Sequence, residues 1–279
     1  MWRLERSTRE YLRIGRESVE RWTGMSSNIE FVASQPLPPR IGESTRAGIW
    51  GDLEAAIRFL YAAKPKVGVT LLLESALIPT FLLEIGSELW APSHVQMLLR
   101  HRLQALYGEP GSTIDSWTCR IDYVAGERFA LGFGLESSFQ HALVKTCASA
   151  GIECAGLLPA LAWGLSCTHS TSKWRGQPGC LAWPEQDRLI LAHVKAGCVV
   201  GLNAAASLTS DSSAILRQIE IDRVRCGMPP IGPVVAVRWR KTASADIPRE
   251  ASVDPAVIWV DAGYAANGTT AARPLATQP

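Results

Sequence analysis

The sequence lacks an excess of either charge, a long uninterrupted hydrophobic run and any C-x-x-C pair. Its 28 lysines and arginines against 26 acidic residues leave a formal net charge of +2 over 279 residues. A balance this even gives no field strong enough to select nucleic acid or an anionic membrane. With 47% hydrophobic and 19% charged residues, the chain is predicted to be globular, as one large domain or two lobes.

The most apolar segments, 67–86 and 194–208, do not provide the ~20 consecutive apolar residues that a membrane span needs. Acids and a proline interrupt the first segment, and Lys195 and Asn203 lie in the second, which is also short. The N-terminal residues carry charge throughout, unlike a secretory signal. The seven cysteines are scattered, which favours reduced thiols over a zinc site. We therefore predict a cytoplasmic protein with no direct membrane insertion.

Hydrophobic periodicity predicts the same order of elements twice, namely three short strands, a helix and a further strand, with more mixed elements between the two series. This repetition predicts two α/β lobes. A polar, glycine-rich stretch at 168–179 is the expected boundary, giving a first lobe at 1–170, a reduced second lobe at 171–245 and a partly ordered tail at 246–279. The expected strands are 11–15, 18–22, 28–33, 67–73, 77–85, 117–124, 129–134, 151–158, 180–183, 189–194, 198–202, 234–239 and 257–260, and the expected helices are 47–63, 92–108, 137–149, 161–165 and 214–225.

Three common enzyme motifs are absent: the phosphate-binding P-loop, the G-x-G-x-x-G fingerprint and the G-x-S-x-G elbow. The G-x-G at 132–134 lacks a third glycine and is interpreted as a turn at a strand end. Ser137 and Ser138 precede His141 on one predicted helix, but no acid that would orient this histidine is identifiable. A solvated helix face is the simpler interpretation, so no catalytic residue is predicted here.

Other candidate side chains also favour structural interpretations. His94 and His101 share a helix face but lie seven residues apart, which is too far for two ligands of one metal ion on a single helix. Glu74 and Glu84 flank predicted strand ends, where α/β enzymes place catalytic acids, although strands also meet water there. We predict no metal site, and we interpret these acids as the points where buried strands become solvated.

A basic run with one aromatic residue, RWRK at 238–241, ends a predicted strand. Stacking and phosphate contacts would allow nucleic-acid binding. In a strand, however, Trp239 faces away from Arg238 and Arg240, so the three cannot contact one nucleic-acid strand together. An edge strand protected by charge is the preferred interpretation, and no nucleic-acid partner is predicted.

The segment Tyr11–Trp22 reads YLRIGRESVERW. Two strands joined by I-G-x-x-S-V resemble the first phosphate loop of the ATPase superfamily that contains actin and the heat-shock chaperones. The likeness is closer to PilM, the cytoplasmic protein of type IV pilus assembly, and the cytoplasmic region of GspL in type II secretion has a similar layout. The resemblance covers about residues 11–240, mainly through the order of elements. It implies an α/β, two-lobed actin-like (ribonuclease H-like) fold with mixed sheets and a reduced second lobe.

The positions that would hold a nucleotide depart from the family pattern. The family aspartate before I-G is Arg13 here, and a guanidinium would repel Mg²⁺. In the D-x-G of the second phosphate loop, Trp183 replaces the acid, and Pro184 removes a donor amide. The glycine pair of the adenosine loop is absent from the RWRK run. The resemblance therefore implies no bound ATP or other cofactor and two vestigial loops, the first of Arg13, Ile14, Gly15, Ser18 and Val19 and the second of Trp183 and Pro184.

The function implied by the resemblance is a non-enzymatic scaffold of a type IV pilus or type II secretion platform. Such a scaffold would bind the cytoplasmic tail of a single-span, PilN-like inner-membrane protein and connect it to a motor ATPase. It would lie in the cytoplasm, peripheral to the inner membrane through this partner. Two alternatives stay open, namely an active actin-like ATPase or sugar-kinase relative, and an unrelated α/β protein with a small ligand.

Overall fold

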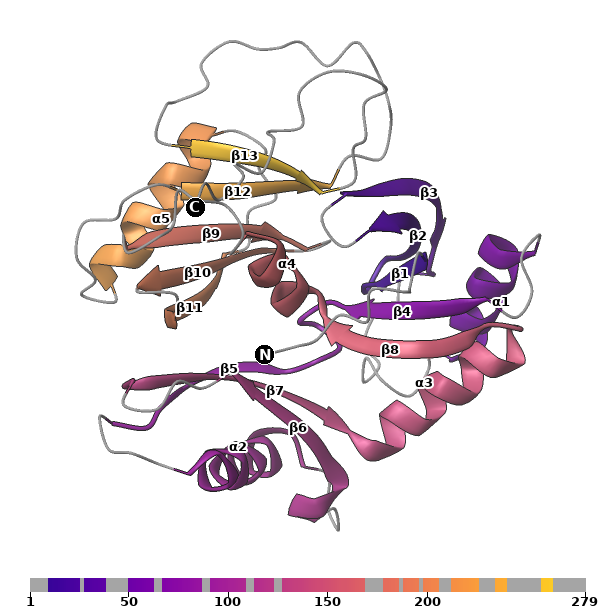
Figure 1. Ribbon diagram of the computed structural model, residues 1–279, viewed down its shortest axis with the longest axis horizontal. Coiled ribbons are helices and arrows are strands. Elements are labelled where there is room, and N and C mark those ends of the chain that lie inside the picture. The colour runs from indigo at the N-terminus through magenta and orange to yellow at the C-terminus, as the bar shows by residue number, and fades with distance from the viewer. Residues whose placement is uncertain are drawn as a thin grey trace, which may run out of the picture.

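The computed structural model (Figure 1) describes the chain in thirteen stretches, and every structural statement below concerns these residues. The described residues are 10–25, 28–38, 50–62, 67–86, 91–108, 113–122, 127–168, 178–185, 188–195, 198–205, 212–225, 234–239 and 257–262. Most of the predicted boundary at 168–179 lies outside them.

A first five-stranded sheet has the order β3-β2-β1-β4-β8. Its first three strands form an antiparallel meander, and β4 and β8 then add in parallel to β1. Helices α1 and α3 pack against each other on one side, while α4 contacts β4, β8 and β9 and lies between the two large sheets (Figure 1). The bounds are β1 Glu10–Ile14, β2 Ser18–Met25, β3 Asn28–Pro36, β4 Gly68–Leu73, β8 Glu153–Pro159, α1 Trp50–Tyr61, α3 Ser137–Ser149, α4 Ala160–Thr168 and β9 Gly179–Pro184.

A second five-stranded sheet repeats this topology with the order β11-β10-β9-β12-β13. Its first three strands are again antiparallel neighbours, and β12 and β13 again add in parallel. The prediction that one pattern is used twice is confirmed. The strand expected at 257–260 is present as β13, inside the segment predicted as a tail. The bounds are β10 Leu189–Lys195, β11 Cys198–Ala205, β12 Val234–Trp239, β13 Val257–Ala262 and α5 Ser212–Arg225.

The interpretation of the 238–241 run as an edge strand is wrong. Arg238 and Trp239 belong to β12, which pairs with β9 on one side and with β13 on the other. Over the described residues the edge strands of this sheet are β11 and β13, because the chain after β12 supplies one more parallel strand. Residues 240 and 241 lie outside the described part of the chain.

A smaller antiparallel sheet, β5-β7-β6, carries helix α2 on one side (Figure 1). The G-x-G at 132–134 lies inside β7 and not in a turn, which corrects that interpretation. A Cβ atom at Gly132 would lie 2.7 Å from Leu99 Cδ1, so the missing side chain allows α2 to approach β7 closely. The bounds are β5 Thr80–Glu84, α2 Pro92–Tyr107, the 3-10 helix η1 Ile114–Ser116, β6 Trp117–Asp122 and β7 Phe129–Glu136.

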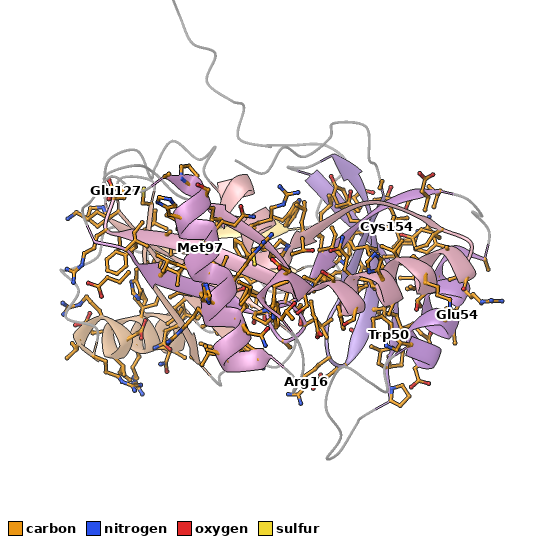
Figure 2. All side chains as sticks on the ribbon, turned by 90° about the horizontal axis from the view of Figure 1, so that it is seen from below. Arg16, Trp50, Glu54, Met97, Glu127 and Cys154 are labelled. Carbon is orange, nitrogen blue, oxygen red and sulfur yellow. The ribbon has the colours of Figure 1, made fainter. Side chains whose placement is uncertain are left out.

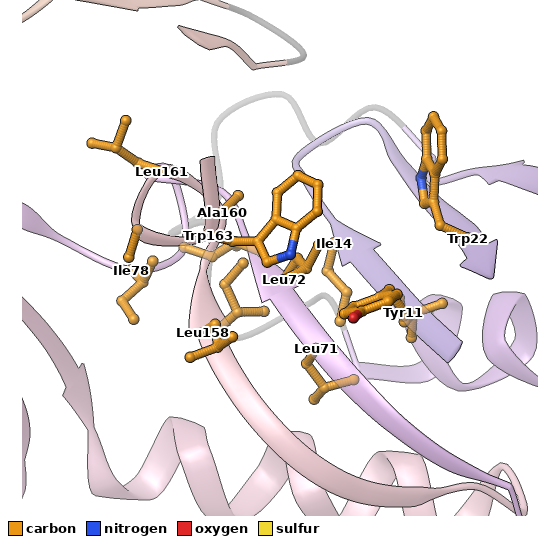
Figure 3. Close-up of a cluster of buried hydrophobic side chains, with 14 of the residues drawn as sticks. Tyr11, Ile14, Trp22, Leu71, Leu72, Ile78, Leu158, Ala160, Leu161 and Trp163 are labelled. Carbon is orange, nitrogen blue, oxygen red and sulfur yellow. The ribbon is translucent and has the colours of Figure 1, made fainter. Parts of the chain in front are cut away.

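The main hydrophobic cluster extends from the first sheet across α4 to the second. Figure 3 shows the indole of Trp163 on α4 beside Leu72 and Ile14, with the ring of Tyr11 close by. The centroids of the Tyr11 and Trp163 rings are 6.3 Å apart. Because strands of both large sheets contribute to one core, α4 holds the two sheets together as well as covering the first.

A buried polar cluster fastens α5 to the second sheet. Asp222 Oδ2 lies 2.7 Å from His193 Nε2, and Asn203 Nδ2 donates to Asp222 Oδ1. His193 and Asp222 are both almost completely buried. Buried polar groups that satisfy one another in this way stabilise one packing of a helix on a sheet.

The cysteines agree with the prediction of reduced thiols wherever their side chains are described. Cys119, Cys147, Cys154, Cys180 and Cys198 are free, and three of them are buried. Burial raises the pKa of Cys147 to about 12 and that of Cys119 to about 11. Over the described residues no cluster of histidine, cysteine and acidic groups could hold a metal ion, and no helix is long and apolar enough to cross a membrane.

Candidate functional site at the junction of the large sheets

The two vestigial loops expected from the sequence meet in space. β1 and β4 are parallel, so Arg13 and Glu74 lie together at the carboxyl ends of their strands, and the amide of Glu74 donates to Ile14 O at 3.1 Å. Trp183 and Pro184 lie at the carboxyl end of β9 in the other sheet. Carboxyl ends of parallel strands are where α/β proteins bind ligands, so this junction is the candidate site.

Arg13 is the centre of the junction. Its Nη1 donates to Glu20 Oε2 at 3.2 Å, and its Nη2 forms an ion pair with Glu74. The same Nη2 donates to the backbone oxygen of Pro184 at 3.1 Å, which joins the two sheets. The side chains of Arg13, Glu20 and Glu74 are 3%, 0% and 0% exposed. A charged group buried this deeply is tolerated only when it is paired and hydrogen-bonded.

The hairpin between β1 and β2 holds Glu20 in place. Arg13 and Glu20 are directly opposite in the antiparallel ladder, and Trp22 Nε1 donates to Glu20 Oε2 at 3.3 Å. Ser18, which the resemblance assigns to a phosphate loop, lies 3.4 Å from Glu20 Oε1 through its hydroxyl. The amide of Gly15 donates to Ser18 O at 3.1 Å and closes the turn, while Ile14 and Val19 pair opposite each other and are buried.

Glu185 makes a second connection across the junction. Its Oε1 accepts from the amide of Ser75 at 2.8 Å, and its Oε2 accepts from the Ser75 hydroxyl. Burial raises the pKa of Glu185, although the two Ser75 hydrogen bonds and the charges of Arg13 and Arg188 act in the opposite direction. Glu185 therefore joins the segment that follows β9 to the segment that follows β4.

Trp183 closes the junction on the side of α4. Its side chain is fully buried, and its ring centroid lies 6.1 Å from that of Trp163 in an edge-to-face arrangement. Gly164 faces the Trp183 ring so closely that a Cβ atom there would overlap it. The sequence analysis placed Trp183 where the family has an acid, and the structure gives this indole a packing role between the sheets.

These residues do not fit the magnesium nucleotide that an actin-like site would hold. Arg13 places a positive charge in the junction, and Glu20 and Glu74 both pair with it. Arg13 donates to Pro184 O, and the amide of Ser75 donates to Glu185 Oε1, so these contacts occupy the space between the two sheets. Phosphoryl transfer depends on positioned amides and a metal ion, and the carboxylates that could hold a metal here are already paired with Arg13 or Ser75.

Of the remaining candidates, Glu74 lies in the junction and the others lie elsewhere. Glu74 is fully buried in the junction, so its interpretation as the point where a strand meets water is wrong. Glu84 does meet solvent and pairs with Arg128 on the surface. His94 and His101 are exposed on α2, and Ser138 and His141 are exposed on α3, away from the junction.

Sequence reasoning missed Glu20, Ser75 and Glu185. A signal for Glu20 was present, because the short turn after Ile14 fixes a hairpin register that places Arg13 opposite an acid. No comparable signal existed for Ser75 and Glu185, because their contact joins segments 110 residues apart.

The structure defines a two-lobed actin-like fold. No protein-family model and no curated protein sequence matches the chain. Among solved structures, it is similar to one described as the PilM-PilN type IV pilus biogenesis complex, with a TM-score of 0.58 and 11% identity over 83% of this chain and 81% of that one. At this identity the likeness establishes the fold.

Two further solved structures give lower TM-scores. The cytoplasmic domain of EpsL, an inner-membrane component of the type II secretion system of Vibrio cholerae, has a TM-score of 0.48 and 14% identity over 81% of this chain and 80% of that one. A Bacteroides thetaiotaomicron protein with an actin-like ATPase fold and unknown function has a TM-score of 0.46 and 8% identity over 88% and 87%.

Proposed function

We propose that this protein is a non-catalytic, actin-like scaffold of a type IV pilus or type II secretion platform. It binds the cytoplasmic tail of a single-span inner-membrane protein and connects that protein to a motor ATPase. In this role it is cytoplasmic and reaches the membrane through its partner. We also propose that the lobes divide near residue 170, with the segment after residue 245 contributing β13 to the second lobe.

The observation that carries this proposal is the interaction of Arg13 with Glu20, Glu74 and Pro184. A nucleotide-dependent actin-like protein needs acids and backbone amides that face a metal and a phosphate chain. Here the corresponding groups hydrogen-bond one another and hold the lobes together. A fixed relation between the lobes suits a protein that presents one unchanging surface to a partner.

The partner assignment rests on the fold shared with the PilM-PilN structure, which is described as a complex of type IV pilus biogenesis. An extended tail can pair with the edge of a sheet through backbone hydrogen bonds. The first sheet ends in β3 and β8, and these strands offer such edges. The junction itself is less suitable, because its polar groups are already engaged across the two lobes.

Two titrations test the proposal. Calorimetry with ATP and Mg²⁺ should give no binding at millimolar nucleotide. A synthetic peptide with the cytoplasmic tail of a single-span protein encoded beside this gene should bind, and a scrambled peptide of the same composition should not. Tail binding that is unchanged by ATP supports the scaffold, whereas failure of the tail to bind removes the scaffold assignment.

An active ATPase is the second candidate. It is favoured by three buried carboxylates, Glu20, Glu74 and Glu185, gathered at strand ends where actin-like enzymes place their acids. Micromolar binding of ATP in the first titration, lost in the variant Glu74→Gln, would establish this alternative and overturn the scaffold proposal.

A further inference from the structure

Helix α2 exposes an unusual amount of apolar surface. Nine large hydrophobic side chains in the described residues are exposed, and four of them belong to this helix. The inner face of α2 packs on the small sheet through Val95, Leu99 and Leu103. The exposed four are Met97 (49%), Leu98 (37%), Leu106 (49%) and Tyr107 (46%).

The outward face of α2 combines two of these apolar groups with basic side chains. By helical spacing, Met97 and Leu98 share the outer face with His94 and His101, and all four are exposed. The exposed Arg102 borders this face on one side. Figure 2 looks onto this side and shows α2 across the front of the molecule, with Met97 upon it.

Negative charge is scarce on this face. None of the sixteen residues from Pro92 to Tyr107 is acidic. Arg100, half-buried on the other border of the face, lies 3.6 Å from Asp115 Oδ1, which is the acid that η1 brings to the helix. The chain as a whole is nearly neutral, whereas α2 carries two arginines and two histidines and no acid.

The mixture of side chains indicates which kind of surface would cover α2. A partner helix needs a continuous apolar stripe, and here His94 and His101 interrupt the stripe. A lipid surface presents the same chemistry everywhere. Its boundary region accepts methionine and leucine, while an exposed arginine on the border of the face extends to anionic headgroups.

We propose that the outward face of α2 docks on an anionic lipid surface at headgroup depth, with no segment crossing the bilayer. Met97 and Leu98 enter the boundary between headgroups and acyl chains, and the exposed Arg102 contacts phosphates beside them. This contact is independent of the partner tail. It would orient the molecule so that the small sheet faces the membrane.

The test is co-sedimentation of the full chain with vesicles of 30% phosphatidylglycerol in phosphatidylcholine, and with pure phosphatidylcholine vesicles, at 0.1 M salt. The wild type should bind the anionic vesicles, bind the neutral ones far less and be released at 0.5 M salt. The variant Arg102→Glu should lower the partition coefficient for anionic vesicles about tenfold, because each basic residue near an anionic surface raises that coefficient several-fold.

The double variant Met97→Ser, Leu98→Ser separates the apolar contribution from the charge. It should weaken binding at both salt concentrations, whereas Arg102→Glu should matter mainly at low salt. Matched controls are Arg217→Glu on α5, an exposed charge reversal, and Phe59→Ser on α1, where the side chain is 67% exposed. Both controls should bind vesicles as the wild type does, and thermal melting should confirm that all four variants fold.

Absence of binding to anionic vesicles overturns the proposal. An equal loss of vesicle binding in the α2 variants and in the controls overturns it as well. If the α2 variants leave vesicle binding unchanged but abolish binding of the tail peptide, the face is a protein-docking surface and the lipid assignment is wrong. Because tail binding is measured without vesicles, failure of this inference is distinguishable from failure of the proposed function.

Discussion

Arg13 donates a hydrogen bond of 3.1 Å from its Nη2 to the backbone oxygen of Pro184, a residue 171 positions further along the chain. This bond connects the two large sheets at the carboxyl ends of β1 and β9. The guanidinium of Arg13 is also paired with two buried acids, so the contact is part of a charged cluster and not an isolated surface bond. The first prediction concerns this arginine.

Replacing Arg13 with alanine should lower the free energy of unfolding by about 3–5 kcal/mol, because Glu20 and Glu74 would stay buried without their cation. Urea denaturation measures this change. The matched control is Arg58→Ala, which breaks an exposed pair with Glu54 and should cost less than about 1 kcal/mol. Equal losses of unfolding free energy in the two variants would contradict a buried ionic junction.

Replacing Gly164 with alanine should lower the free energy of unfolding by about 1–3 kcal/mol, because the added Cβ overlaps the buried ring of Trp183. Thermal or urea unfolding measures the loss. Gly51→Ala on α1 is the control, since nothing lies within 4 Å of its Cβ position. That change should stabilise the protein by about 0.5–1 kcal/mol, as alanine favours a helix more than glycine does.

Glu185 should make stability depend on pH in the direction opposite to most acids. Burial raises its pKa in the folded state, so the folded protein holds this proton more tightly than the unfolded chain. Its contribution to the free energy of unfolding is therefore present below the unfolded-state pKa and is lost as pH rises through the folded-state value. Between pH 4 and pH 8, the free energy of unfolding of the wild type should accordingly fall relative to that of Glu185→Gln.

The control for this titration is Glu220→Gln. A hydrogen bond from Arg223 lowers the pKa of Glu220, so its contribution has the opposite sign and is lost as pH falls. Urea denaturation of all three proteins across the pH range supplies the data. A constant difference between wild type and Glu185→Gln at every pH would show that Glu185 has an ordinary pKa.

Replacing Asp222 with alanine should lower the free energy of unfolding by about 1–3 kcal/mol, because His193 and Asn203 lose a buried partner. Hydrogen exchange should show faster exchange of the α5 amides, since this cluster fastens α5 to its sheet. Glu220→Ala on the same helix removes an exposed group and should leave α5 exchange near wild type. Equally faster amide exchange over the whole chain would instead indicate that α5 does not unfold as a separate unit.

Much of the architecture could be predicted from local patterns. The alternation in β1 and β2, the apolar run of β4 and the proline that begins α2 each identify an element, and α3 has the expected bounds. The repetition of three strands, a helix and a strand predicted two α/β lobes, and the same pattern is present in the two large sheets. These features depend on neighbours along the chain, and that is where a sequence carries its clearest signal.

The contents of the junction could be predicted only in part. Arg13, Trp183 and Pro184 were singled out because they depart from a family pattern, and the structure brings Arg13 and Pro184 into contact. Glu74 was recognised as a strand-end acid, but its burial depends on a cation that arrives from another strand. Such information lies in three-dimensional proximity, which periodicity within single elements does not reveal.

The allocation of strands to sheets determines the order in which the protein can fold during its synthesis. Every strand of the first sheet lies between residues 10 and 159, whereas the second sheet uses residues 179 to 262. Because the ribosome delivers the N-terminal part first, the first sheet can form while the second is still untranslated. Arg13 then already has Glu20 and Glu74 as partners, so the nascent chain neutralises this cation before Pro184 emerges to complete its contacts.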